Sequence, residues 1–254
     1  MTPGNKACIR SDSPRRPDGS ASRPCFHPRV LRVDAVPVKN GARMKALEDC
    51  RLYAFVDTAC LRDRRPDVVA GQLCEGGADL IQLRAKDLSV EEIRLLAETI
   101  LPVTRRADVG LVINDHLAVA TAVGAEFCHL GQEDFFTAGH RHVSELENPG
   151  GVKIGLSTHA PGQARRAVSA GAQYVAIGPV YATGTKPQAA PVTLEYVRWA
   201  AANVTVPWFA IGGITLSNLE EVLAAGARRI CVVSAILGAA NIARACAEFR
   251  NRLT

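Results

Sequence analysis

The chain has 254 residues, of which 48% are hydrophobic and 22% are charged, a globular composition that excludes disorder over the whole chain. The formal net charge of +5 would suggest nucleic-acid binding if it lay in the folded part. Residues 1–43, however, carry nine Lys or Arg and three Asp, while the rest of the chain carries 21 basic and 22 acidic side chains. The charge therefore gives no support to a nucleic-acid partner.

The eight cysteines form no CxxC pair and follow no secretory leader, which favours a reducing compartment over a disulfide framework or a structural zinc site. No apolar run reaches the roughly 18 residues that a membrane span needs. We therefore expect a cytoplasmic protein without a membrane partner.

Residues 1–43 are rich in Pro, Gly, Ser and Arg and show neither helical nor strand periodicity. We predict a disordered basic extension here, followed by a single catalytic domain over residues 44–254. Three Asp residues and repeated Pro count against an organellar transit peptide. A second hypothesis is that translation begins at Met44, just before the ordered pattern starts.

From residue 51 onward, an apolar β-branched run, a polar turn and an amphipathic helical stretch recur. The eight predicted strands are residues 51–57, 80–86, 110–115, 126–131, 153–158, 174–180, 208–214 and 229–236. Apolar strands that alternate with helices of about 10 to 15 residues predict a parallel sheet covered by helices. Eight such repeats favour a closed (β/α)8 TIM barrel in the α/β class, with a doubly wound open sheet as the alternative.

Four of these strands are introduced by a glycine: Gly77, Gly124, Gly171 and Gly226. A glycine at this point can end the preceding helix in the left-handed conformation and turn the chain back into the sheet. We therefore predict helix ends at these four positions.

The second predicted strand contains QLRAK, which alternates polar and apolar residues with a period of two. Gln82, Arg84 and Lys86 share one face, and Leu83 and Ala85 share the other. The apolar face suits packing against helices, so the amide and the two cations turn toward the barrel interior. Buried unpaired cations are costly, which favours an anionic ligand. The alternative is that Arg84 and Lys86 pair with acids inside the barrel.

Two carboxylates follow neighbouring strands, since Asp115 ends VIND and Asp134 lies just past CHLGQ. Neighbouring strands are about 4.8 Å apart, so the two groups can share a divalent cation. Oxygen ligands suit Mg²⁺ bound together with substrate phosphates, and Asn114 can add a neutral amide. The alternative is that both aspartates cap the following helices.

The sixth predicted strand runs into a loop in which Thr183, Gly184, Thr185 and Lys186 follow one another. Hydroxyls, a glycine and an ammonium group in sequence can surround an oxyanion. Ser157, at the end of the fifth strand, is well placed as a further hydrogen-bond donor, whereas we assign no chemical role to His159.

The seventh predicted strand ends in Gly212 and Gly213, and the eighth reaches Val233 and Ser234. In TIM barrels the loops after these two strands often hold a phosphate through backbone N–H groups. We infer a second phosphate site here, separate from the metal-linked one, although a tight turn alone would also call for glycine.

Seven segments in this order resemble the thiamine-phosphate synthase family: QLRAK, IND, GQED, LSTH, GPVYATGTK, IGGI and VVSAI. The resemblance covers about residues 51–250, and seven motifs separated by helix-length gaps are far more specific than one. It implies a transferase that joins a hydroxymethylpyrimidine diphosphate to a thiazole phosphate, through a pyrimidine carbocation, and releases pyrophosphate.

The resemblance also implies roles for individual residues. The pyrimidine diphosphate would be held by the second-strand segment and its neighbours, namely Gln82, Leu83, Arg84, Ala85, Lys86, Asn114, Ser157 and Lys186. The thiazole phosphate would be held by Thr183, Gly184, Thr185, Gly213, Val233 and Ser234. Asp115 and Asp134 would bind the Mg²⁺ cofactor, and the catalytic cations that stabilise the departing pyrophosphate would be Arg84, Lys86 and Lys186.

Two other functions remain open at this point. A thiazole tautomerase-like protein is similar around STH, and there a histidine in this region transfers protons, which would give His159 a role. A catalytically silent regulator would need the phosphate sites alone. The joint presence of Arg84, Lys86, Asp115 and Asp134 favours the synthase, whose partners would be small-molecule substrates. The sequence is compatible with a homo-oligomer.

Overall fold

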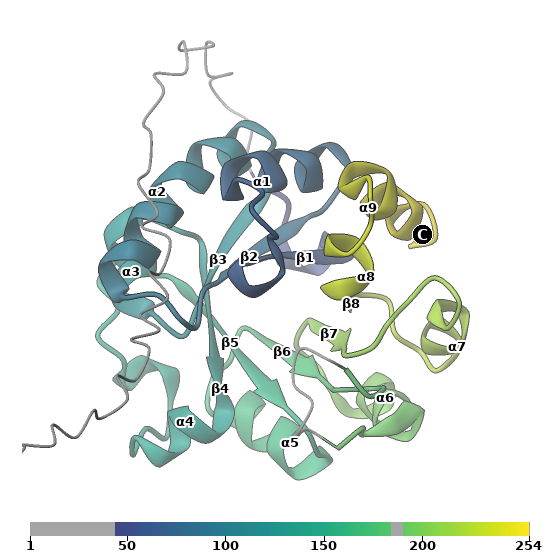
Figure 1. The fold of residues 1–254 in the computed structure, drawn as a ribbon. Helices are drawn as coiled ribbons and strands as arrows, with labels where there is room; N and C mark the ends of the chain where they lie inside the picture. The colour runs from purple at the N-terminus through teal and green to yellow at the C-terminus, as the bar shows by residue number, and fades with distance from the viewer. Residues whose placement is uncertain (1–43, 184–189, 254) are drawn as a thin grey trace, which may run out of the picture. The chain divides into compact units, whose positions relative to one another are not determined.

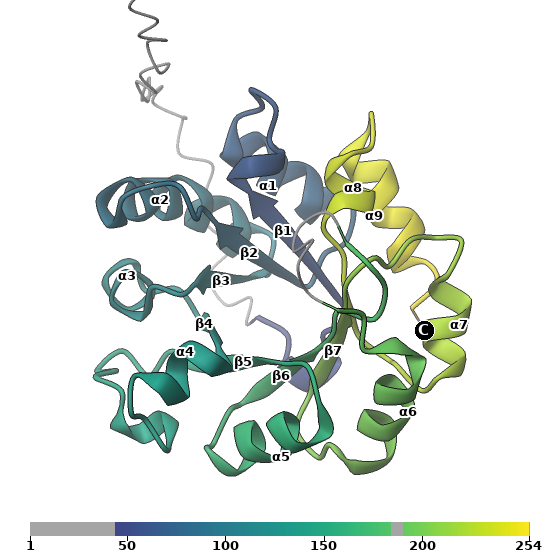
Figure 2. The ribbon, with the colours of Figure 1, turned by 60° about the horizontal axis from the view of Figure 1, so that its bottom comes forward.

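The computed structural model describes residues 44–183 and 190–253 of the chain. Eight parallel strands pair in chain order, each with the next and the last with the first, into a closed barrel. Helices surround the strands, as Figures 1 and 2 show. The predicted TIM barrel is confirmed, and the doubly wound alternative is excluded.

The strands begin within one residue of their predicted starts. They are β1 (Leu52–Asp57), β2 (Leu80–Arg84), β3 (Gly110–Asn114), β4 (Phe127–Gly131), β5 (Lys153–Thr158), β6 (Tyr174–Ile177), β7 (Trp208–Ile211) and β8 (Ile230–Cys231). The last three are shorter than predicted because their C-terminal residues leave the sheet to form the loops around a pocket. Ser234, predicted to lie in the eighth strand, instead begins a helix.

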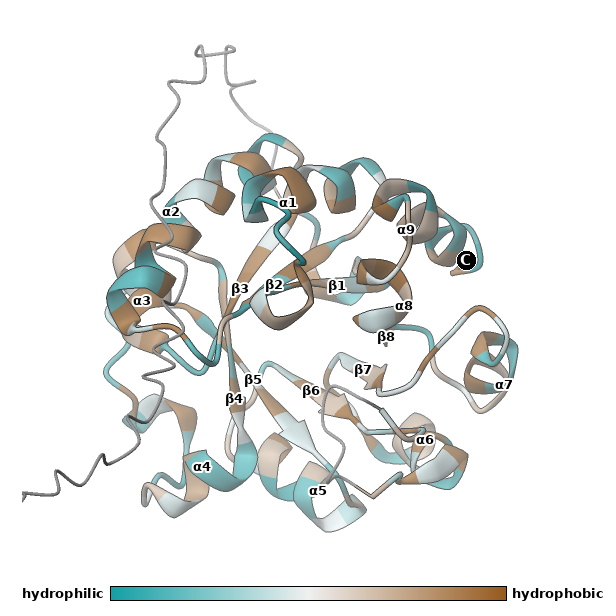
Figure 3. Cartoon of the chain, in the orientation of Figure 1, coloured by the Kyte–Doolittle hydropathy of each residue, from teal (hydrophilic) through white to brown (hydrophobic). Residues whose placement is uncertain are grey.

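The helices of the described residues are α1 (Pro66–Glu75), α2 (Val90–Arg106), α3 (Leu117–Val123), α4 (Gln132–Thr137), α5 (Pro161–Ser169), α6 (Thr193–Asn203), α7 (Leu219–Ala224), α8 (Ser234–Leu237) and α9 (Ile242–Arg250). Three 3₁₀ turns, η1 (Leu47–Asp49), η2 (Thr58–Cys60) and η3 (Val143–Glu145), complete them. Along α2 and α9 hydrophobic and hydrophilic residues alternate (Figure 3), as expected for helices with one face on the barrel. Within the described ranges, no helix has the length and apolarity required to cross a membrane.

All four glycines predicted to end helices have a positive φ, between 72° and 101°. Gly124 is the left-handed C-cap of α3 itself. This conformation costs glycine little, because it has no Cβ. The predicted helix ends are therefore confirmed.

Two apolar layers hold the barrel together. Leu52, Ala54 and Val56 of β1 belong to the layer between the strands and the helices, whereas Tyr53 and Phe55 belong to the layer inside the barrel. This is the period of two expected for a strand buried on both faces.

The N-terminal end of the barrel is closed by η1 and by a buried carboxylate. Leu47 and Cys50 pack into the interior layer from below. Asp79, whose side chain is 1% exposed, accepts hydrogen bonds from Lys45 Nζ (2.6 Å) and from the backbone N–H groups of Arg51 and Leu52. These contacts join the segment before β1 to the start of β2. The predicted extension over residues 1–43 lies outside the described residues, and it and the domain boundary at residue 44 stay predictions.

Candidate active site

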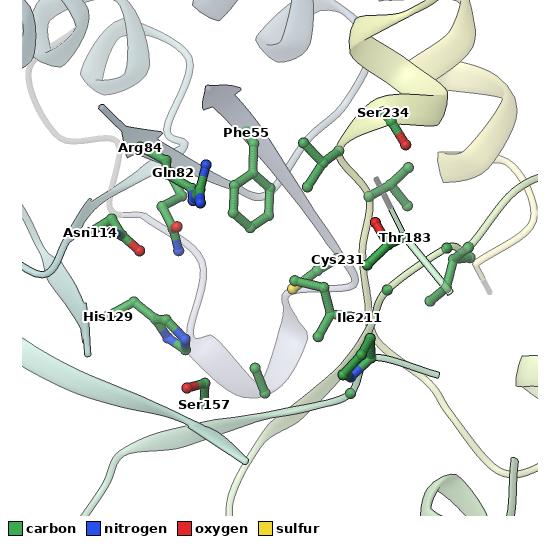
Figure 4. Close-up of a pocket in the computed structure, with 18 of the residues that line it drawn as sticks. Phe55, Gln82, Arg84, Asn114, His129, Ser157, Thr183, Ile211, Cys231 and Ser234 are labelled. Carbon is green, nitrogen blue, oxygen red and sulfur yellow. The ribbon is translucent and has the colours of Figure 1, made fainter. Parts of the chain in front are cut away.

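A pocket opens at the C-terminal ends of the strands, the end where TIM barrels carry their active sites. It draws residues from all eight strands or the loops that follow them, and Figure 4 labels several of these residues. Eight of the predicted site residues line it: Gln82, Arg84, Asn114, Ser157, Thr183, Gly213, Val233 and Ser234. The fold thus brings together residues that lie as much as 152 positions apart in the sequence, from Gln82 to Ser234.

The pocket has two chemically different walls. Gln82, Asn114 and His129, from β2 to β4, make a polar wall in Figure 4, and Ile211 and Cys231 face them from β7 and β8. Burial raises the pKa of the Cys231 thiol well above its ordinary value, so this cysteine is a neutral, apolar part of the wall.

Arg84 forms an ion pair at the rim of the polar wall. Its Nη1 lies 2.8 Å from Oδ2 of Asp57, the last residue of β1, and β1 pairs with β2 so that the two residues are opposite each other. The side chain of Asp57 is 2% exposed and that of Arg84 is 16% exposed. The structure therefore shows for Arg84 the pairing with an acid that the sequence left open, while the guanidinium still lines the pocket.

Lys86 and Asp115 form a second, more open ion pair. Lys86 Nζ lies 2.7 Å from Asp115 Oδ2, and the side chains are 51% and 31% exposed. Asp115 has a φ of 64°, in the left-handed region, and its Oδ2 also accepts a hydrogen bond from Asn114 (2.7 Å). Neither Lys86 nor Asp115 lines the pocket itself; both lie beside it, past the ends of β2 and β3.

Asp134 lies in the first turn of α4, and its carboxylate folds back over the end of β4. A Cβ atom built on Gly131 would lie 2.6 Å from Asp134 Oδ2, so any other side chain at residue 131 would displace the carboxylate. No side-chain capping hydrogen bond is formed at the start of α3 or of α4. The geometry thus gives no support to the alternative in which Asp115 and Asp134 serve as helix caps.

The two carboxylates that the sequence predicts as metal ligands follow adjacent strands. β3 pairs with β4, and Asp115 N donates to the carbonyl of His129 (2.9 Å), so the two carboxylates follow adjacent strands. Within residues 44–183 and 190–253, no group of three or more His, Cys, Asp or Glu side chains could enclose a metal. Mg²⁺ commonly takes one or two carboxylates and completes its shell with water and substrate phosphate oxygens.

The opposite side of the pocket is built from turns that bring backbone close to backbone. Gly213 has a φ of 64°, and a Cβ on it would lie 2.7 Å from the carbonyl oxygen of Ala182. Val233 and Ser234 meet this turn from the start of α8, and Thr183 from the loop after β6. Gly184, Thr185 and Lys186 lie outside the described residues.

Leu83 and Ala85 point away from the pocket. Their side chains are buried in the layer between the strands and the helices, as the alternation within QLRAK predicts. Any contact of these two residues with a ligand would therefore come from their backbone.

Several residues in or beside the pocket were not singled out from the sequence. Asp57 ends RLYAFVD as Asp115 ends VIND, so the position of an acid at a strand end was a usable signal. Phe55 and His129 occupy interior-facing positions of their strands, which alternation also indicates. His159 lines the pocket as well, and its Nδ1 is hydrogen-bonded to the carbonyl oxygen of Gly178.

The comparisons with known proteins show which family the chain belongs to. The family model described as thiamine monophosphate synthase matches residues 52–236. Thiamine-phosphate synthase from Halalkalibacterium halodurans is 38% identical over 204 residues, which are 80% of this chain and 95% of the relative. Its counterpart from Thermus thermophilus is 46% identical over 179 residues, or 70% of this chain and 84% of the relative.

Solved structures support the same assignment. Thiamine phosphate pyrophosphorylase from Pyrococcus furiosus superposes with a TM-score of 0.69 at 29% identity, covering 82% of this chain and 96% of that chain. A 3-hexulose-6-phosphate synthase, at 20% identity and a TM-score of 0.57, shares the fold alone. The family model spans all eight strands and includes every described residue of the pocket. The chain therefore belongs to the thiamine monophosphate synthase family.

Proposed function

We propose that the chain is a Mg²⁺-dependent transferase that couples a hydroxymethylpyrimidine diphosphate to a thiazole phosphate, forming thiamine phosphate and releasing pyrophosphate. The observation that carries this proposal is the placement of two different sets of polar groups on opposite sides of one pocket. Arg84, Lys86 and two carboxylates lie on the side of β2 to β4, and a glycine turn with hydroxyls lies on the side of β6 to β8.

On the first side, Arg84 would bind the diphosphate while Asp57 holds the other part of its guanidinium. Lys86 would exchange Asp115 for a diphosphate oxygen, because its side chain is half exposed and can move. Such positively charged groups stabilise the charge that develops on a departing pyrophosphate. Asp115 and Asp134 would hold Mg²⁺, which when bound neutralises further charge on the leaving group.

On the second side, the backbone around Gly213 and the hydroxyls of Thr183 and Ser234 would bind the thiazole phosphate. Holding both substrates from opposite walls would align the thiazole nitrogen with the pyrimidine methylene carbon. Apolar side chains such as Phe55 and Ile211 line the space between and would keep water from the reacting carbon. The bond from the methylene carbon to the diphosphate oxygen would break first and leave a pyrimidine carbocation with pyrophosphate as the leaving group. The thiazole nitrogen would then donate its electron pair to this carbon, so no general base is required.

The proposal is tested by incubating the purified chain with both phosphorylated substrates, with Mg²⁺ or with EDTA, and measuring thiamine phosphate and pyrophosphate. We expect equal amounts of both products with Mg²⁺ and a large loss with EDTA. Full activity in EDTA would overturn the metal requirement. Isomerisation of a carboxylated thiazole phosphate without coupling would overturn the synthase and favour the tautomerase, and tight thiazole phosphate binding without any reaction would favour the regulator.

A further inference from the structure

Four polar side chains form a chain of hydrogen bonds across the floor of the pocket. Gln82 Nε2 donates to Tyr53 OH (2.6 Å), Tyr53 OH lies 3.3 Å from Tyr174 OH, and Tyr174 OH lies 3.2 Å from His129 Nδ1. The chain crosses the barrel interior from β2 through β1 and β6 to β4. Its two ends, Gln82 and His129, line the pocket, whereas the two tyrosines lie below it.

The tyrosines are fully enclosed. Tyr53 is 1% exposed and Tyr174 is 0% exposed, and their rings pack edge to face with a centroid separation of 6.2 Å. Burial raises the pKa of both hydroxyls well above the ordinary value, so each keeps its single proton. A buried hydroxyl proton without an acceptor costs free energy, so each proton must point at a partner.

These constraints fix one donor-to-acceptor direction for the whole series of hydrogen bonds from Gln82 to His129. Tyr53 accepts from Gln82, and among the described residues its other hydrogen-bond partner is Tyr174, so Tyr53 donates to Tyr174. Tyr174 must then donate to His129 Nδ1, which places the proton of the neutral imidazole on Nε2. With Nε2 of Gln82 engaged by Tyr53, the amide oxygen Oε1 is the atom that Gln82 offers to a ligand.

We propose that Tyr53 and Tyr174 are positioning residues that keep the carbonyl oxygen of Gln82 turned into the pocket. Each hydroxyl accepts a hydrogen bond from the preceding side chain and donates one to the next, from the Gln82 amide to His129. An amide oxygen accepts, so the group selected at this point is an amino group on a heteroaromatic ring. The ligand class rests on the proposed function, whereas the direction of the chain rests on the contacts alone.

The proposal predicts an effect at a distance. In Tyr174→Phe, the Tyr53 proton loses its acceptor, and the remaining partner that can accept it is Gln82, provided that the amide turns its oxygen toward Tyr53. The NH2 group would then face the pocket and repel the amino group of the pyrimidine. We expect KM for the pyrimidine diphosphate to rise about tenfold, the worth of one hydrogen bond, with KM for the thiazole phosphate unchanged.

The double variant Tyr53→Phe/Tyr174→Phe separates this account from simple damage to the interior. Without the Tyr53 hydroxyl nothing holds the amide in the wrong orientation, so we expect the pyrimidine KM to fall back to the value of Tyr53→Phe alone. A double variant at least as impaired as Tyr174→Phe would overturn the proposal. The matched control is Tyr196→Phe, which removes a buried hydroxyl that bonds Thr158 and Ala160 on the helix-facing side and should leave KM unchanged.

A readout without substrate tests the direction itself. In protein labelled with ¹⁵N-histidine, with the signals of residue 129 assigned from His129→Gln, the shifts of the two ring nitrogens report which one is protonated. We expect Nδ1 to be unprotonated in the native chain and a mixture of both states in Tyr174→Phe. A proton on Nδ1 in the native chain would overturn the proposal, whether or not the protein makes thiamine phosphate.

Discussion

The two ends of the barrel each carry an aspartate, and these two aspartates differ in burial and in hydrogen bonding. At the N-terminal end, Asp79 is buried and bonded to Lys45 and to two backbone N–H groups, and Arg250 Nη1 lies 3.6 Å away. At the C-terminal end, Asp115 is 31% exposed, has a left-handed backbone and bonds Lys86, a side chain that is itself half exposed. A carboxylate with all its bonds satisfied stabilises the fold, whereas one whose partner can leave is available to a ligand.

The pKa of Asp79 also indicates that this carboxylate stabilises the fold. Burial alone would raise the pKa of this carboxyl, but the hydrogen bond from Lys45 and those from the Arg51 and Leu52 backbone together lower the pKa below its ordinary value of 3.8. The charged form is thus the one that the folded protein stabilises.

The largest expected effect on stability comes from removing this carboxylate. Asp79→Ala leaves two buried N–H groups without an acceptor and removes the negative charge next to Arg250. We therefore expect a loss of about 3 kcal/mol in the free energy of unfolding. Urea denaturation measures it. Glu248→Ala, which breaks an exposed pair with Arg244 in α9, is the control and should change the free energy of unfolding by less than about 0.5 kcal/mol. A free energy of unfolding close to the native value in Asp79→Ala would contradict the claim that this carboxylate stabilises the fold.

The complementary change at the other end is Asp134→Ala. We expect native stability and a decrease in kcat of about 100-fold or more, because a group that stabilises transition-state charge is lost. Glu133→Ala removes the neighbouring exposed carboxylate of the same helical turn and serves as the control, with kcat unchanged. Near-normal turnover in Asp134→Ala would show that this carboxylate takes no part in catalysis.

A smaller effect is expected from pH. Because the pKa of Asp79 is lower in the folded chain than in the unfolded one, its stabilising contribution is full above the unfolded value of 3.8 and is lost as pH falls through the folded value. The difference in unfolding free energy between the native chain and Asp79→Asn should therefore be constant above about pH 5 and shrink below about pH 4. A difference that grows toward acid would contradict the sign of the shift.

The smallest effect is expected from deleting residues 1–43. Met44 packs against the interior layer, and Lys45 and Leu47 close the barrel, so a chain that starts at Met44 keeps these contacts. We expect unfolding free energies within about 0.5 kcal/mol of each other for the two chains. A chain that starts at Arg51 is the contrast, since it loses Leu47 and Cys50 from the interior. Equal stability of all three chains would show that η1 does not close the barrel.

The sequence predicted the fold well because its signals are local and repeated. Eight apolar runs with a glycine before every second one favour a parallel barrel, and only closure of the sheet distinguishes it from the doubly wound alternative. The largest errors in the predicted strand ends lie in β6, β7 and β8, where apolar residues continue past the last strand pair, and β2 also ends two residues before its predicted end. Val232, for instance, is buried and donates its N–H to the carbonyl of Tyr53, yet Ser234 two residues later begins α8. Hydropathy does not distinguish a buried strand from a buried helix start.

The site was harder to predict, because pairing across strands depends on register. Arg84 and Asp57 are 27 residues apart, and their opposition follows from the β1–β2 register, which the sequence does not state. The tyrosines of the floor are ordinary core residues by composition, and their hydrogen bonds depend on which interior side chains meet. Gln82 was found because its polar side chain interrupts an apolar strand.

The most direct test of the account is a crystal structure of the chain grown with Mn²⁺ and inorganic pyrophosphate. The account predicts an anomalous peak for Mn²⁺ at the carboxylate oxygens of both Asp115 and Asp134, with pyrophosphate bridging from this ion to Arg84. Lys86 would then have left Asp115. An ion bound away from both aspartates, or pyrophosphate bound outside the C-terminal end of the barrel, would contradict it.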